Sequence, residues 1–297
     1  MAGEAAAVEI ASRRGPWARR ALAGWACVIY FFLFSPIVLL ILLSFNKNRY
    51  GTFPITGWTL HWFTSIASSP DLQSAIKTSL RVAVEVTLVA TVVGTAAAFP
   101  LVRSVRRFRT TFRIAFTLPI MIPGVLIGVS LLTFLRQELG IQLSTETVVI
   151  GQAVYTTPFV LLIVASRLEG FDRSLELAAS DLGANAIRRF RHVILPLIGP
   201  AVFAGALFAF TLSLDEFVIT FFIIGPEITL PIYIYTQIKF GITPAINAVA
   251  TLLIVISLGI TGLGLVVPRL IGKASRYVRG KRAQRMTEAA PAAPARA

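Results

Sequence analysis

The sequence predicts an all-α, polytopic membrane protein, and two features of its composition support this. Of its 297 residues, 56% are hydrophobic and only 14% are charged, whereas a soluble domain carries about 25% charged residues. The apolar residues also form long runs, and a helix needs about 20 of them to cross the hydrocarbon core. Strands of a membrane barrel would instead alternate polar and apolar residues. We therefore expect membrane-spanning helices.

Six apolar runs reach this length, and each predicts one transmembrane helix. Glu85 lies in the second run, Asp215 and Glu216 lie in the fifth, and the other runs are uncharged. We expect one membrane domain over residues 21–272, between a basic N-terminus at 1–20 and a disordered basic tail at 273–297. The predicted helices lie near residues 21–45, 82–102, 114–135, 147–166, 193–224 and 240–268.

The positions of the basic residues predict the orientation. If the N-terminus lies in the cytoplasm, 22 of the 28 Lys and Arg residues fall in cytoplasmic segments. Positively charged loops stay on that side of a membrane, so we expect both termini in the cytoplasm of a bacterium, with the helices in its inner membrane. Anionic headgroups then account for the net charge of +14 without a nucleic-acid partner.

Few residues offer catalytic or metal-binding chemistry. Cys27 is the single cysteine and lies in an apolar run, and His61 and His192 are far apart. No cluster has the spacing of metal ligands, and no GxxxxGK[ST] loop for a nucleotide phosphate occurs. We therefore predict no catalytic residue, metal or cofactor, and we expect any ATP hydrolysis to be carried out by a separate partner.

The loop between the fourth and fifth predicted helices, Arg167–Pro196, is longer than a simple connection needs. It predicts two short helices separated by Gly183, with Leu195 and Pro196 at the start of the next membrane helix. A short helix with adjacent small residues, Ala178 and Ala179, can lie close to a groove of another protein. An amphipathic helix at the membrane surface is the alternative.

The stretch from Leu175 to Pro200, LELAASDLGANAIRRFRHVILPLIGP, resembles the EAA loop of permeases of ATP-binding cassette importers. That pattern is Glu-Ala-Ala, three residues, Gly, and later a hydrophobic residue, any residue and Leu-Pro. Leu177 stands where the pattern has its glutamate, and Glu176 comes one residue early. The resemblance implies that the loop, residues 169–196, docks an ATPase through Glu176, Ala178, Ala179, Asp181, Gly183, Ala184, Leu195 and Pro196.

A wider resemblance, over roughly residues 30–270, is to the PotC-type permeases of spermidine/putrescine importers. It implies a second homologous permease subunit, two ATPase subunits and a periplasmic solute-binding protein as partners, and a small cationic solute as the cargo. An opine, another amine or iron is the alternative cargo, and a secondary transporter is the alternative class. The residues that carry the resemblance are Ser44–Asn46, Ser166–Asp172, Thr211–Glu216, Gly225–Pro226, Leu230–Tyr233 and Ile246–Thr251.

Carboxylates inside a membrane span are costly and mark candidate functional sites. Asp215 and Glu216 are therefore candidates for the substrate pathway. Alternatively, they lie at the outer, hydrated end of the fifth helix. We expect Glu85 to pair with Arg81, one turn earlier. The aromatic outer segment after the first helix predicts a short interfacial helix over Thr59–Ser68.

Overall fold

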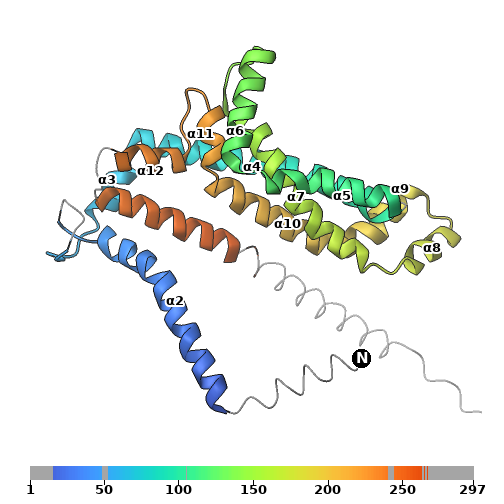
Figure 1. Cartoon of the computed structure of the whole chain (residues 1–297), viewed down its shortest axis with the longest axis horizontal. Helices are drawn as coiled ribbons and strands as arrows, with labels where there is room; N and C mark the ends of the chain where they lie inside the picture. Colours follow the sequence, from blue (N-terminus) through green and yellow to red (C-terminus); the bar gives the residue numbers. More distant parts are fainter. Residues whose placement is uncertain are drawn as a thin grey trace, which may run out of the picture. The chain divides into compact units, whose positions relative to one another are not determined.

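The computed structural model describes residues 16–48, 53–104, 106–239, 244–262, 264 and 266. These residues are nearly all helical and contain no strand, only an isolated bridge between Asn46 and Trp58. The helices, coloured along the chain in Figure 1, are α2 (Pro16–Ser44), α3 (His61–Ala67), α4 (Pro70–Arg103), α5 (Arg106–Met121), α6 (Gly124–Thr133), η1 (Phe134–Glu138), α7 (Thr145–Glu169), α8 (Ser174–Asp181), α9 (Ala186–Arg189), η2 (Phe190–Ile194), α10 (Leu195–Asp215), α11 (Val218–Ile223), α12 (Leu230–Lys239) and an unlabelled helix at Pro244–Gly262.

The chain divides into two compact units. One contains Met1–Ser69 with Thr236–Leu253, and the other contains Pro70–Tyr235 with Ile254–Ala297. In the first unit, α3 lies within the predicted interfacial segment, and its Trp62 donates an indole N–H to the carbonyl oxygen of Asn46 at 2.8 Å. The predicted tail at residues 273–297 lies outside the described residues.

Within the described residues, five helices are long and apolar enough to cross a membrane, and a bent pair makes up to six. The expectation of an all-α protein with several spans is therefore confirmed. The second span begins at Pro70, before the predicted residue 82, because its first turns are polar and hydropathy alone does not detect them. The five continuous spans are Arg20–Ser44, Pro70–Arg103, Thr145–Glu169, Ala186–Asp215 and Pro244–Gly262.

The third predicted helix, residues 114–135, is not continuous. Arg109–Met121 and Gly124–Glu138 are bent by 95° at the break between α5 and α6. Pro119 lies in the last turn of α5, and Pro123 is the N-cap residue of α6 with an extended ψ of 134°. Proline lacks the N–H that an uninterrupted helix needs and clashes with the preceding turn, which accounts for the break.

The fifth predicted helix, residues 193–224, also ends early. Helix α10 ends at Asp215, and Glu216 is extended, with ψ of 121°, before α11 begins. The Glu216 carboxylate accepts hydrogen bonds from the backbone N–H groups of Ile219 and Thr220. The first N–H groups of a helix have no carbonyl partner within that helix, and the Glu216 carboxylate accepts their hydrogen bonds instead. A second helix therefore begins at this point.

Helices α4, α7 and α10 run side by side in the larger unit (Figure 1), and small residues let them approach closely. A Cβ atom on Gly94 of α4 would lie 2.9 Å from Cβ of Val160 on α7, and one on Gly205 of α10 would lie 3.1 Å from a Val160 methyl. Val160 is thus buried between two glycines, as small residues at membrane helix interfaces allow. The surrounding core contains Ala90, Leu101, Leu161, Val164, Ile198 and Ala209.

A second core cluster joins α11 to α6 and α7. A Cβ on Gly128 would lie 2.7 Å from the Phe222 ring and 3.3 Å from the Ile219 backbone. The short helix α11 therefore packs on α6 at a glycine, and Figure 1 shows the two lying together. The buried apolar members of this cluster include Val82, Val86, Ile127, Val148, Ile219 and Ile223.

Candidate functional site

The predicted coupling loop begins with a capped helix. The side chain of Asp172 accepts a hydrogen bond from the backbone N–H of Ser174, the first residue of α8, at 2.9 Å. This hydrogen bond lowers the pKa of Asp172, because it stabilises the ionised carboxylate. Glu176 lies in the first turn of α8, where a negative charge is favourable.

Gly183 terminates α8 in a conformation that favours glycine. Its φ is +79°, and its N–H donates to the carbonyl of Ser180 at 2.9 Å. The N–H of Ala184 donates to the carbonyl of Ala179 at 3.0 Å. This pair of hydrogen bonds is the Schellman motif. A Cβ on Gly183 would meet no atom within 4 Å, so glycine is needed here for the backbone angle and not for space.

Helix α9 follows directly and is tied to α8. The side chain of Asn185 accepts a hydrogen bond from the N–H of Arg188 at 2.9 Å, which makes it the N-cap of α9. The guanidinium of Arg189 donates to the hydroxyl of Ser180 on α8 at 2.6 Å. A π-helical turn, η2, then leads into α10. Figure 1 shows α8 and α9 close together at one end of the α7 and α10 pair.

Two ion pairs connect this loop to other helices. Arg103, the last residue of α4, contacts the Glu176 carboxylate at 2.5 Å. Arg109 of α5 contacts Glu169 at the end of α7. The guanidinium of Arg103 also lies 5.2 Å from the centre of the Phe99 ring, a cation–π contact. The sequence offers no direct signal for these pairs, because their partners are 73 and 60 residues apart.

The structure gathers most of the predicted coupling residues into one short segment. Those from Glu176 to Ala184 lie on α8 and its Schellman turn, whereas Leu195 and Pro196 begin α10 beyond η2. Glu176 is held by Arg103, while Asp181 and Gly183 are exposed. The motif does not call for the large apolar side chains that this segment exposes, of which the three most exposed are Leu177, Leu182 and Ile187.

Asp215 and Glu216, the predicted pathway residues, have different surroundings. The Glu216 carboxylate accepts from the N–H of Ile219 at 2.7 Å, from the N–H of Thr220 at 3.0 Å and from the Thr220 hydroxyl at 2.6 Å. It therefore caps α11. Asp215 is exposed, and its carboxylate has no hydrogen bond or ion pair with any of the residues that the structure describes.

A buried polar chain supports the break between α10 and α11. The Ser213 hydroxyl of α10 donates to the side-chain oxygen of Gln152 on α7. The Gln152 amide nitrogen donates to the Thr220 hydroxyl of α11 at 2.7 Å, and Thr220 donates in turn to Glu216. Gln152, Ser213 and Thr220 are all buried. Sequence reasoning missed this chain, although Gln152 is a polar residue inside an apolar run.

The two helix breaks line one cavity of about 490 Å³. Asp215 and the aromatic residues Tyr155 and Phe217 line it, together with residues of the α5–α6 break. An uncompensated carboxylate near aromatic rings can attract an organic cation. The lining residues are Ile120, Met121, Ile122, Pro123, Gly124, Tyr155, Leu212, Asp215, Glu216, Phe217, Val218 and Ile219.

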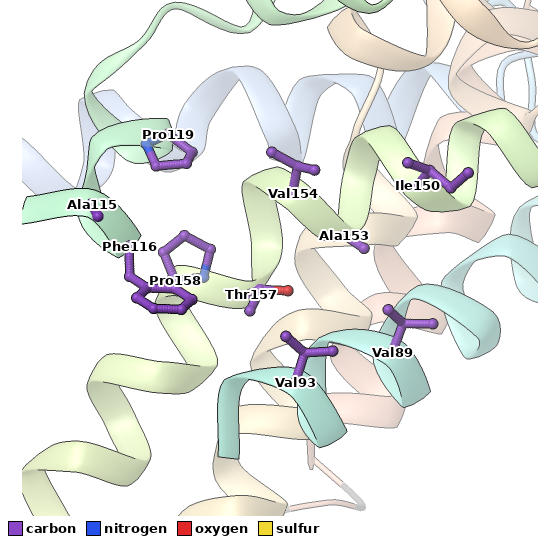
Figure 2. Close-up of a pocket in the computed structure, with 10 residues that line it drawn as sticks. All are labelled: Val89, Val93, Ala115, Phe116, Pro119, Ile150, Ala153, Val154, Thr157 and Pro158. Carbon is purple, nitrogen blue, oxygen red and sulfur yellow. The ribbon is translucent and has the colours of Figure 1, made fainter. Parts of the chain in front are cut away.

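A second pocket, of about 390 Å³, lies between α4, α5 and α7 and is apolar (Figure 2). Val89 and Val93 line it from α4, and Phe116 and Pro119 line it from α5. Among the described residues that line it, Thr157 alone is polar, so the pocket presents no charge to a solute. No group of His, Cys, Asp and Glu suited to a metal ion occurs within the described part of the chain.

Comparison with known proteins adds a family and a fold. Residues 90–272 match the family described as "Binding-protein-dependent transport system inner membrane component". The chain is 38% identical over 236 residues to the spermidine/putrescine transport system permease protein PotC of Escherichia coli (strain K12), covering 79% of this chain and 89% of that protein. It is 36% identical over 264 residues to the putrescine transport system permease protein PotI of the same strain, covering 85% and 92%.

A solved structure shares the arrangement of helices. It is the crystal structure of a bacterial ABC transporter involved in the import of the acidic polysaccharide alginate, whose matched chain has a TM-score of 0.70 at 16% identity. The match covers 86% of this chain and 96% of the other. At that identity, the likeness shows the fold and carries nothing about the solute.

Proposed function

The chain belongs to the family of binding-protein-dependent transport system inner membrane components, and from this premise we propose that it moves a small cation of the putrescine and spermidine class across the bacterial inner membrane. It is a permease subunit of an ABC importer and not an enzyme. The observation that carries the solute class is the 38% identity over most of the length of a spermidine/putrescine permease.

The cavity at the two helix breaks supports a cationic cargo. A polyamine has ammonium groups on an apolar chain, so it needs a carboxylate for charge and apolar or aromatic surface for the chain. Asp215 supplies the carboxylate, and Tyr155 and Phe217 supply rings on the same cavity. Glu216 lines the same cavity, but its carboxylate is engaged by the backbone of α11. We assign Asp215, rather than Glu216, to contact with the passing ammonium group.

The loop at α8 and α9 is the proposed docking site for the ATPase. Its capped, glycine-terminated helix is exposed at the end of the bundle and is joined to α4 by the ion pair of Glu176 with Arg103, while a second pair joins the end of α7 to α5. Such connections can transmit a movement of the ATPase to the membrane helices. In this arrangement the chain pairs with a second homologous permease, two ATPase subunits bind at the cytoplasmic face, and a periplasmic protein delivers the solute.

The distribution of basic residues supports the orientation that this arrangement needs. With the N-terminus inside, 22 of the 28 Lys and Arg residues lie on the cytoplasmic side, among them Arg173, Arg188 and Arg191 of the coupling loop. The loop then faces the ATPase compartment. Labelling of single cysteines placed at α8 and in the loop before α12, with a reagent that does not cross the membrane, tests this directly.

The experiment that tests the solute is uptake of labelled putrescine and spermidine. Cells lacking polyamine import would carry this permease with its neighbouring transport genes, beside an Asp215→Asn version and an Asp71→Asn control outside the cavity. We expect ATP-dependent uptake that falls in Asp215→Asn only. Absence of polyamine uptake by an assembled complex, with uptake of an opine, another amine or an iron carrier instead, would overturn the solute class and leave the importer assignment standing.

A further inference from the structure

The coupling segment, residues 172–191, exposes large aliphatic side chains. Leu177 is 65% exposed, Leu182 is 88% exposed and Ile187 is 76% exposed. Large aliphatic side chains this exposed, and grouped on one short segment, mark an interaction surface. Because Leu182 precedes Gly183 and Ile187 lies on α9, the Schellman turn and the bond between Arg189 and Ser180 hold these side chains on one compact hairpin.

Of the two acidic residues of α8, Asp181 is exposed, whereas Glu176 is unavailable to a partner. The Glu176 side chain is only 14% exposed and lies 2.5 Å from the Arg103 guanidinium. One residue later, at the position where the EAA pattern has its glutamate, the exposed side chain is Leu177. The one-residue shift noted in the sequence therefore has a structural consequence, which is an inward carboxylate and an outward leucine.

We propose that this permease contacts its ATPase through an apolar patch of Leu177, Leu182 and Ile187, and that Glu176 acts inside the permease as a positioning residue. This inference rests on the proposed docking of an ATPase at the loop. The exposed charged residues of the same segment are mostly cations: Arg173, Arg188 and Arg191, beside Asp172 and Asp181. The surface that fits it is therefore a groove with an apolar floor and carboxylates at its rim.

A protein groove fits this segment better than a lipid surface does. A helix that lies on a membrane needs one continuous apolar face. Residues of a helix are separated by about 100° each, so Leu175 and Leu177 of α8 point about 200° apart, and both are exposed. Helix α8 has eight residues and no single apolar stripe. A groove that surrounds the segment can cover both sides, whereas a flat interface can cover only one.

The test is the affinity of the purified ATPase for the assembled membrane subunits in lipid nanodiscs. We expect Leu182→Ser with Ile187→Ser to weaken binding by about tenfold or more, as truncation of central interface residues does. Leu139→Ser, which removes an exposed leucine elsewhere in the chain, should leave the affinity unchanged. Intact affinity in the double variant would overturn the proposal, and if that variant instead lost affinity for vesicles of anionic lipid, the patch would be a membrane contact.

Salt and charge separate an apolar contact from an ionic one. Salt screens any ion pairs at the rim equally in every variant, so a salt dependence that is stronger in Leu177→Glu than in the unmodified permease reports a contact centred on that glutamate. We expect Leu177→Glu to weaken binding of the ATPase. Glu176→Gln should change the affinity for the ATPase by less than about twofold. Tighter, salt-sensitive binding of Leu177→Glu would contradict the proposal.

The variant Gly183→Arg tests docking of the ATPase at this loop separately from the apolar contact. If Gly183→Arg abolishes ATPase binding while the leucine and isoleucine variants bind normally, the loop is the docking site and only the apolar contact is wrong. If Gly183→Arg also binds and transports normally, docking at this loop is itself wrong. Insertion and size-exclusion profiles of each variant establish that the subunit is assembled.

Discussion

Asp215 and Glu216 are neighbours in the sequence, but their side chains are held differently, and this predicts different consequences of neutralising each. The Glu216 carboxylate accepts three hydrogen bonds at the start of α11, and Asp215 is exposed at the cavity wall. Loss of a helix-capping side chain costs about 0.5–2 kcal/mol. We expect Glu216→Ala to lower the thermal midpoint of the purified subunit and Asp215→Ala to leave it unchanged while reducing uptake. The opposite result would assign the capping role to Asp215 and the contact with the solute to Glu216.

Gln152 is the residue whose loss should disturb the break between α10 and α11 without touching the solute. It accepts from Ser213 and donates to Thr220 inside the bundle. Hydrogen bonds between membrane helices contribute about 1 kcal/mol each, so we expect Gln152→Leu, which removes two of them, to lower stability by about 2 kcal/mol. A thermal melt in detergent measures it.

A double-mutant cycle separates this hydrogen bond from simple packing. Ser213→Ala removes the other partner, and the double variant with Gln152→Leu should be more stable than the sum of the two single effects predicts. Additive effects would mean that the two side chains do not interact in the membrane.

At the scale of whole helices, substitution of glycine by alanine should change stability in opposite directions at two kinds of position. A Cβ on Gly94 would lie 2.9 Å from Cβ of Val160 and 3.0 Å from the backbone of α7, so α4 and α7 would have to separate. Overpacking of this kind costs about 1–3 kcal/mol. Gly199 of α10 has no atom within 4 Å of such a Cβ, and Gly199→Ala should stabilise the helix by about 0.5–1 kcal/mol. Thermal midpoints of both variants check this, and equal shifts would contradict it.

Gly183 belongs to neither class, because its surroundings are open and its backbone is left-handed. Gly183→Ala should cost about 1–2 kcal/mol of local conformational energy, with no steric clash. Asparagine tolerates the left-handed conformation, so uptake should decrease in the order Gly183, Gly183→Asn, Gly183→Ala. Equal uptake by the alanine and asparagine variants would show that the angle at this turn is not needed for coupling.

For the molecule as a whole, hydropathy and the EAA-like spacing were enough to predict the all-α membrane fold and the family. Hydropathy gave residues 114–135 and 193–224 as one helix each, because Pro123 and Glu216 act on the backbone and an average over apolar residues does not register them. The sequence also left two roles open for Glu216, and the structure gives it a capping role. Contacts such as that of Arg103 with Glu176 join residues 73 apart, and no local pattern indicates them.

The contact between Arg103 and Glu176 predicts how movement is coupled across the whole subunit. Arg103 ends α4, and Glu176 lies on α8, so their ion pair links the proposed ATPase site to a membrane helix of the central bundle. Partly exposed ion pairs contribute about 0–1 kcal/mol to stability, so Arg103→Gln should fold and insert normally. We expect it to lower the amount of solute moved per ATP hydrolysed, because α8 can then tilt without moving α4.

Reversing the pair distinguishes this link from a general effect of charge. Arg103→Glu combined with Glu176→Arg restores the attraction with both charges exchanged, and we expect it to recover more coupling than either single reversal. The measurement is the ratio of labelled solute to phosphate released in proteoliposomes that contain the assembled importer. If the reversed pair were no better coupled than the single variants while binding the ATPase normally, the connection would have to run elsewhere, with the Arg109 and Glu169 pair between α5 and α7 as the next to reverse.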